Sequence, residues 1–144
     1  MRDNKSAYNS VIYDENIVST LPYYREYHNQ IIDLVKAMGT QNIDWLDTGC
    51  GTGTLASRVL SCRDDVRFTL CDPSEQMLDI ARNKLQGHDI RVFNIPSQKM
   101  TFDSEFDVVT AVQSHHYLKP NERRTALKRW ENFLSDHLKD PEVV

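Results

Sequence analysis

The chain has 144 residues, of which 40% are hydrophobic and 26% are charged, and its net charge is −4 with a sequence pI near 5.7. This length suits one domain with a single core, and the composition excludes an intrinsically disordered chain. Binding to nucleic acid requires a concentrated basic face, whereas the one basic cluster, at 123–129, is typical of a solvated helix face, so no nucleic-acid partner is expected.

The cysteines and the hydropathy pattern indicate where the protein is located. The chain has an odd number of cysteines, namely Cys50, Cys62 and Cys71, and they lack the spacing of zinc ligands. We therefore expect neither a disulfide framework nor a metal site. No apolar run approaches the roughly 20 residues of a membrane span, and the polar N-terminus lacks the apolar core of a signal peptide. We therefore expect a cytoplasmic protein with no membrane partner.

Two elements are predicted before the first strand. Residues 1–19 are polar with scattered aromatic residues, and we expect an arm or a short helix that is not part of the core. A helix is predicted to begin near Thr20, which would cap it, and to end at Gly39, because apolar residues recur at helical spacing between them. A strand over Ile43–Asp47 and a glycine-rich loop over 48–53 follow.

Strands and helices then alternate along the chain. Further strands are predicted at Val66–Cys71, Ile90–Phe93 and Phe106–Val112. One helix is predicted after the glycine-rich loop, a second after Val66–Cys71, and a last helix beginning at Pro120. Strands that alternate with helices indicate a parallel sheet with helices on both faces, because right-handed crossovers place them there. The sequence therefore predicts an α/β fold and a single domain over residues 1–144.

The loop after the first strand carries three glycines in five positions: Gly49, Gly51 and Gly53. Glycine lets a ligand approach the backbone closely, and the following helix presents unpaired N–H groups at its N-terminus. Turn glycines with a purely structural role are the alternative, but one turn does not require three. A dinucleotide fingerprint would need a glycine where Thr54 stands. The loop is therefore predicted to hold a ligand with an adenosyl or phosphate part.

Asp72 follows the second strand, nineteen residues after Gly53. The carboxyl ends of parallel strands lie at one edge of the sheet, where a carboxylate can accept hydrogen bonds from both hydroxyls of a ribose. The alternative is a capping box formed with Glu75, in which the carboxylate binds helix N–H groups instead.

Three segments, Trp45–Gly53, Leu70–Leu78 and Phe106–Ala111, closely resemble the class I S-adenosylmethionine-dependent methyltransferases, within a resemblance that runs from about Tyr13 to Leu134. The resemblance implies a Rossmann-like three-layer sandwich with strand order 3-2-1-4. It also implies S-adenosylmethionine as the cofactor and methyl transfer as the function. A small-molecule acceptor is expected, because neither a nucleic-acid-binding face nor an appended recognition domain is visible in the sequence.

The resemblance assigns roles to individual residues. It implies that Asp47 and the glycine loop hold the methionine part of the cofactor, that Asp72 binds the ribose, and that Pro73 and Met77 flank the adenine. Met77 as an ordinary core residue and Cys50 as a packing residue are the alternatives. The predicted cofactor-binding residues are Asp47, Gly49, Cys50, Gly51, Gly53, Asp72, Pro73, Met77, Ser97, Gln98 and Ala111.

Methyl transfer from a sulfonium is an in-line displacement, so the protein mainly positions the acceptor and the methyl group. His115 and His116 after the fourth strand are candidates for a catalytic base, and Tyr13 is a candidate from the segment that the resemblance implies to be a lid. The alternatives are a histidine pair that only begins the connection to the last helix, and a tyrosine packed against the core.

The family's domain continues with three further strands where this chain ends at Val144, so we expect a C-terminally incomplete domain. The alternative functions are a non-catalytic cofactor-binding or interaction module and, third, a dinucleotide-dependent oxidoreductase. The uncharged centre of the fourth strand would then form a free edge, and such edges pair with other strands. A homodimer across that edge is predicted.

Overall fold

The predicted strands form one parallel sheet in the computed structural model, which describes residues 12–134. The strands are β1 (Ile43–Thr48), β2 (Val66–Cys71), β3 (Ile90–Phe93) and β4 (Val108–Thr110), in the order β3-β2-β1-β4. Each neighbouring pair is parallel. The predicted α/β class and strand order 3-2-1-4 are confirmed.

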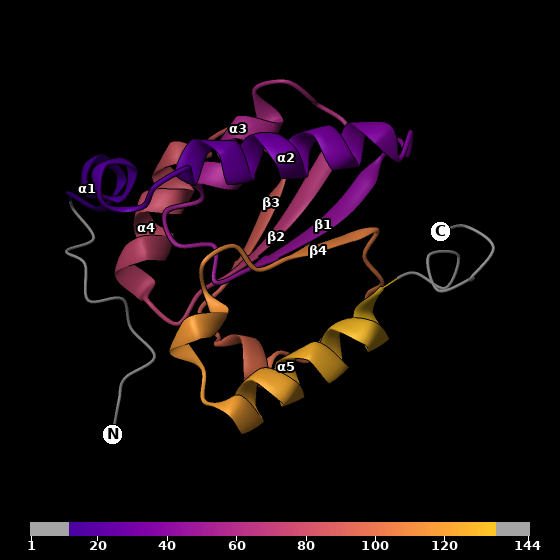
Figure 1. Ribbon diagram of the computed structural model, residues 1–144. Coiled ribbons are helices and arrows are strands. Elements are labelled where there is room, and N and C mark those ends of the chain that lie inside the picture. The colour runs from indigo at the N-terminus through magenta and orange to yellow at the C-terminus, as the bar shows by residue number, and fades with distance from the viewer. Residues whose placement is uncertain (1–11, 135–144) are drawn as a thin grey trace.

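Helices cover both faces of this sheet (Figure 1). On one face lie α2 (Tyr24–Ala37), α3 (Thr54–Leu60) and α4 (Glu75–Lys84), and on the other lies α5 (Pro120–Phe133). Two short 3₁₀ helices, η2 (Ser97–Lys99) and η3 (His115–Tyr117), lie in the connections on either side of β4. None of the helices in the described residues is long and apolar enough to cross a membrane.

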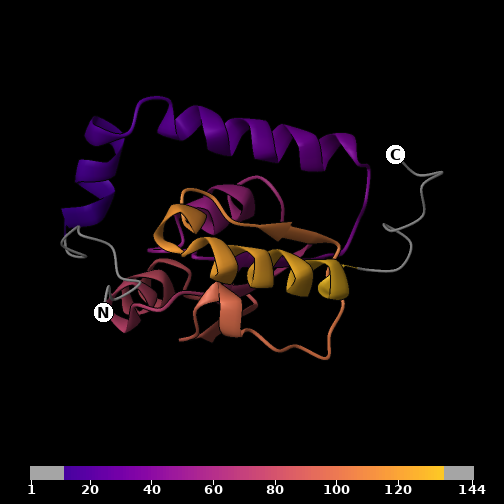
Figure 2. The ribbon, with the colours of Figure 1, turned by 60° about the horizontal axis from the view of Figure 1, so that its bottom comes forward.

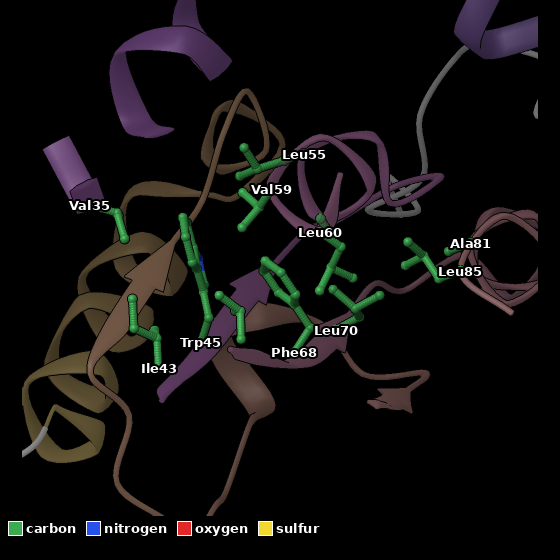
Figure 3. Close-up of a cluster of buried hydrophobic side chains, with 12 residues drawn as sticks. Val35, Ile43, Trp45, Leu55, Val59, Leu60, Phe68, Leu70, Ala81 and Leu85 are labelled. Carbon is green, nitrogen blue, oxygen red and sulfur yellow. The ribbon is translucent and has the colours of Figure 1, made fainter. Parts of the chain in front are cut away.

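Alternate residues of the central strands enter two different cores. Trp45 and Phe68 point towards α2, α3 and α4, where their rings lie 5.1 Å apart (Figure 3). Leu46 and Cys71 point to the opposite face and pack near Phe133 of α5. Because strand residues alternate between faces and both faces are covered, β1 and β2 are buried along most of their length, including the polar residues Asp47, Thr48 and Thr69.

The N-terminal segment departs from the sequence prediction. A helix, α1 (Tyr13–Thr20), ends at the residue that was expected to begin the next helix, and the Thr20 hydroxyl donates back to the Asn16 carbonyl instead of capping. The chain then turns sharply before α2 (Figure 2), and Tyr23 adopts a left-handed φ of 62°. The expected short helix is therefore present, but Ile17 is only 2% exposed, so the expectation that this segment contributes nothing to the core is corrected for that residue.

The fourth strand is shorter than the predicted Phe106–Val112. Thr110 is its last residue, because the chain turns into a bend that includes a left-handed φ of 54° at Gln113. At the other end, Phe106 forms a parallel bridge with Leu134, and its N–H donates to the Phe133 carbonyl at 2.6 Å. The residue after α5 thus covers the start of this edge. Pairing of a second copy with the rest of the edge stays a prediction, and residues 135–144 lie outside the described residues.

The burial of Ile17 predicts that α1 contributes to the stability of the domain. Ile17→Ala should lower the free energy of unfolding by about 2 to 5 kcal/mol, because it leaves a cavity in a packed site. Val18→Ala on the same helix, where the side chain is 43% exposed, should change it by less than about 0.5 kcal/mol. Urea denaturation measures both. Equal small effects would show that α1 is not packed in solution.

Candidate active site

A cleft opens at the carboxyl ends of β1, β2 and β4, where the predicted ligand site lies. Its floor is the loop between β1 and α3, and the segments that follow β2 and β4 form two of its walls. Residues of α1 and α2 close a third side. The lining residues are Tyr13, Tyr24, His28, Asp47, Gly49, Cys50, Gly51, Thr52, Leu55, Asp72, Pro73, Ser74, Met77, Pro96, Ser97, Val112, Gln113, Ser114, Tyr117 and Leu118.

The three loop glycines have left-handed backbones but different surroundings. A Cβ on Gly49 would lie 2.2 Å from the Cβ of Ser114, so no side chain fits there. A Cβ on Gly53 would lie 3.1 Å from the Cβ of Ala81 in α4, so this glycine serves helix packing and does not line the cleft. Gly51 has nothing within 4 Å of such a Cβ. It is the glycine that leaves open space for a ligand.

Asp72 ties the glycine loop to the end of β2. One carboxylate oxygen accepts from the Gly51 N–H at 2.9 Å, and the other accepts from the Ser74 N–H at 2.8 Å. The N-cap of α4 is Ser74, whose hydroxyl accepts from the Met77 N–H, so the carboxylate does not cap the helix itself. Each oxygen has a second lone pair for a further donor. Burial raises the pKa of Asp72 above its ordinary range.

Asp47 lies at the end of β1, and its side chain is held by β4. The Trp45 indole N–H donates to the Thr110 hydroxyl at 2.9 Å, and that hydroxyl donates to the Asp47 carboxyl at 2.7 Å. Burial raises the pKa of Asp47 to about 7, opposed by the Thr110 hydrogen bond and assisted by the charge of Asp72. A cation that enters the cleft would therefore stabilise the ionised form of this carboxyl.

An ion pair joins α1 to α4, and hydrogen bonds join α1 to the end of the glycine loop. Asp14 accepts from Lys84 Nζ of α4 at 2.6 Å, from the Thr54 hydroxyl at 3.2 Å and from the Thr52 hydroxyl. The adjacent Tyr13 lines the cleft, so this contact brings its ring to the site. Asp14 and Lys84 are seventy positions apart, and the sequence analysis identified neither.

The structure brings most of the predicted cofactor residues together. Asp47, Gly49, Cys50, Gly51, Asp72, Pro73, Met77 and Ser97 line the cleft, and their role in binding stays a prediction. Three others are not among the lining residues: Gly53, Ala111 and Gln98, whose side-chain amide donates to Glu122 at 3.5 Å.

The two predicted histidines are likewise not among the residues that line the cleft. The ring of His115 stacks on Trp130 at 4.5 Å, and that of His116 stacks on Tyr117 at 4.0 Å. Of the three candidates for a catalytic residue, only Tyr13 lines the cleft. Burial raises the pKa of Tyr24 to about 12 and that of Tyr13 further, so both phenols stay protonated near neutral pH.

Sequence analysis missed His28, a residue of α2 that lines the cleft and is 2% exposed. Burial lowers its pKa to about 4, and the nearby Arg58 adds to the effect. Its helical position predicts only a core-facing residue. Leu55 and Pro96 also line the cleft without having been predicted. Among the described residues, no group of His, Cys, Asp or Glu side chains could hold a metal ion.

Comparison with known proteins agrees with this geometry. Residues 46–137 match the model of a family described as a methyltransferase domain. The chain belongs to this family. Its fold is that of the class I S-adenosylmethionine-dependent methyltransferases, as the structural neighbours show. The predicted family is confirmed.

Three similar proteins illustrate the range of the family. A carboxy-S-adenosyl-L-methionine synthase of Campylobacter lari is 28% identical over 127 residues, covering 87% of this chain and 54% of that protein. A crystal structure of an S-adenosylmethionine-dependent methyltransferase from Clostridium acetobutylicum has a TM-score of 0.73 and 25% identity, covering 88% of this chain and 52% of that one. The N-methyltransferase NodS from Bradyrhizobium japonicum, with bound S-adenosyl-L-homocysteine, has a TM-score of 0.72 and 20% identity, with coverages of 83% and 60%. The chain spans about half the length of the curated relatives it matches.

The loop geometry of this methyltransferase domain predicts different costs for two similar substitutions. Gly51→Ala should lower the free energy of unfolding by about 1 to 2 kcal/mol, the cost of a left-handed alanine. Gly49→Ala adds the overlap with Ser114 and should cost about 2 to 5 kcal/mol. Adding Gly49→Ala to a Ser114→Gly background should cost less than adding it to the parent. Equal costs in both backgrounds would refute the close approach.

The raised pKa of Asp47 predicts a pH-dependent stability. In the folded state Asp47 keeps its proton up to about pH 7, whereas in the unfolded state it releases the proton above about pH 4. The contribution of Asp47 to the free energy of unfolding is therefore fully present below pH 4 and is lost as the pH rises to about 7. Asp47→Asn keeps the acceptor for Thr110 and should be more stable than the parent at pH 8 by about 2 to 4 kcal/mol. The difference should shrink towards pH 4. Asp103→Asn, at an exposed position, is the control, and parallel stability curves for parent and Asp47→Asn would contradict the prediction.

Proposed function

We propose that this chain binds S-adenosylmethionine in the cleft and transfers its methyl group to a small-molecule acceptor. The observation that carries the proposal is the pair of buried carboxyl groups, Asp47 and Asp72, on either side of a left-handed glycine loop with open space above Gly51. The cofactor carries a sulfonium and an ammonium group, and a nearby cation favours the ionised form of a buried carboxyl.

The cofactor would lie across the loop. Its methionine part would approach the backbone at Gly51 beside Asp47, where the missing side chain leaves room. The ribose hydroxyls would donate to the lone pairs that Gly51 and Ser74 leave on the Asp72 carboxylate. Pro73 and Met77 supply apolar surface for the adenine. This placement accounts for the cleft residues with one extended ligand.

The acceptor would enter beside the aromatic side chains of Tyr13, Tyr24 and Tyr117. The cofactor brings both the electrophile and the leaving group, so the protein accelerates the displacement mainly through proximity and orientation. Asp14 and Lys84, which hold α1 against the loop, would set the position of the Tyr13 ring. This wall would exclude water and align the acceptor's nucleophile with the methyl carbon.

The identity of the acceptor does not follow from the relatives, because their names describe different reactions. One similar protein is a carboxy-S-adenosyl-L-methionine synthase and another is a cypemycin N-terminal methyltransferase. We therefore propose an acceptor class only. We also propose a cytoplasmic location, which the free cysteines Cys50, Cys62 and Cys71 support.

Calorimetric titration with S-adenosylmethionine, S-adenosylhomocysteine and a nicotinamide dinucleotide tests the proposal. The two sulfur nucleosides should bind and the dinucleotide should not. Asp72→Asn should weaken binding of S-adenosylmethionine by about 1 to 3 kcal/mol, because a buried hydroxyl loses its acceptor. It should also lower the melting temperature, since Asp72 holds Gly51 and Ser74.

Glu75→Gln is the matched control for this experiment. It makes the same change of charge three positions along the chain, at an exposed side chain that pairs with Arg82, and it should leave the affinity unchanged. A parent chain that binds the dinucleotide and neither sulfur nucleoside would overturn the proposal. Methyl transfer to candidate small molecules then tests turnover.

A further inference from the structure

A second pocket, of about 450 Å³, lies where α1, α2, α3 and the end of α4 meet. It adjoins the cleft, because Tyr24 and His28 line both. The loop glycines, Asp47 and Asp72 are not among its lining residues, so it is separate from the site proposed for the cofactor. Its own side chains therefore have to show what it binds.

The charged side chains of this pocket do not balance. Asp14 is its single carboxylate among the described residues, and Lys84 Nζ lies 2.6 Å from it, so these two charges compensate each other. The guanidinium groups of Arg25 and Arg58 also line the pocket, and neither forms an ion pair within residues 12–134. Two positive charges thus remain uncompensated here, in a chain whose net charge is −4.

The hydrogen bonds around the pocket leave donors for a ligand. Arg58 Nη1 donates to the Arg25 carbonyl at 2.9 Å and Nη2 donates to the Asn29 side chain, so α2 holds this guanidinium in place. A guanidinium has more N–H donors than these contacts use. The Arg25 side chain and the Ser57 hydroxyl have no hydrogen-bond partner in the part of the chain that the structure describes. One fixed and two free donor groups therefore share the pocket.

We propose that this pocket binds a small molecule through a phosphate or carboxylate group. Guanidinium groups suit both anions, because their planar N–H donors match the oxygen atoms in pairs. Arg25, Arg58 and Ser57 would bind the anion, and Val18, which lines the pocket and is 43% exposed, would contact the apolar part of the molecule. Its ligand would touch the helix that also brings Tyr13 to the cleft.

A chemical-shift titration of the full chain tests this site, with inorganic phosphate and acetate as separate probes and sodium chloride adjusted to hold the ionic strength constant. At least one anion should shift the amide signals of α1, α2 and α3 saturably, and S-adenosylhomocysteine should not displace it. Arg25→Gln should weaken binding about threefold to tenfold, the loss of one exposed charge-assisted hydrogen bond. The melting temperature should stay unchanged, because this side chain has no partner among the described residues. Whichever anion binds more tightly identifies the group.

Arg124→Gln is the matched control, since it makes the same change of charge at an exposed arginine of α5, on the other face of the sheet (Figure 1). It should leave the affinity unchanged. Equal losses for Arg25→Gln and Arg124→Gln would mean a response to net charge and would overturn the proposal. An unsaturated response to both anions, or shifts centred on the glycine loop, would overturn it as well. The titration needs no cofactor, so failure of the proposed function would not affect its outcome.

Discussion

The close approach of Gly49 to Ser114 constrains the shape of the whole cleft. β1 and β4 are neighbours in the sheet, so the segments that follow them leave the same edge and compete for the same space. The chain resolves this with a residue that has no side chain, and Ser114 then donates to the Thr48 carbonyl at 3.2 Å. Thr48 also contacts Ser97 through their hydroxyls. Three separate connections are thereby joined at one point.

A second set of contacts fixes the loop against β2. The Cys71 carbonyl accepts from the N–H groups of Gly49 and Cys50 at 2.7 and 3.0 Å, and Asp72 accepts from the Gly51 N–H. Asp72 thus contributes to the fold as well as to the proposed ribose contact. Its substitution should therefore change stability and affinity together, unlike that of a residue that only contacts the ligand.

The strands were predictable because both faces of the sheet are covered. β2 and β3 have the predicted bounds, since each is rich in apolar and β-branched residues and is followed by a polar residue, Asp72 or Asn94. The fourth strand was predicted too long because Ala111 and Val112 are apolar, and their sequence does not reveal that Val112 turns into the cleft. The predicted boundary between α1 and α2 was wrong, because Thr20 followed by Pro22 is typical of a helix start, whereas here Thr20 ends a helix.

The site was predictable only where its residues form recognisable sequence motifs. The glycine loop and the acid after β2 form a pattern that can be recognised along the chain. His28 and the Asp14–Lys84 pair depend on which faces of α1, α2 and α4 meet, and no short segment encodes that arrangement. The conspicuous adjacent histidines, His115 and His116, instead stack on the rings of Trp130 and Tyr117 and are not among the residues that line the cleft.

Unfavourable features gather around the cleft and are supported by the packing beneath it. Gln113 and Tyr23 adopt left-handed backbones at or beside the lining, His28 holds an unpaired nitrogen, and Asp47 carries a raised pKa. Each feature costs stability on its own. Trp45 and Phe68, fully buried one layer below, belong to a core that tolerates those costs. A cation bound beside Asp47 would favour the ionised form of that carboxyl, so the cost of its burial would be offset on binding.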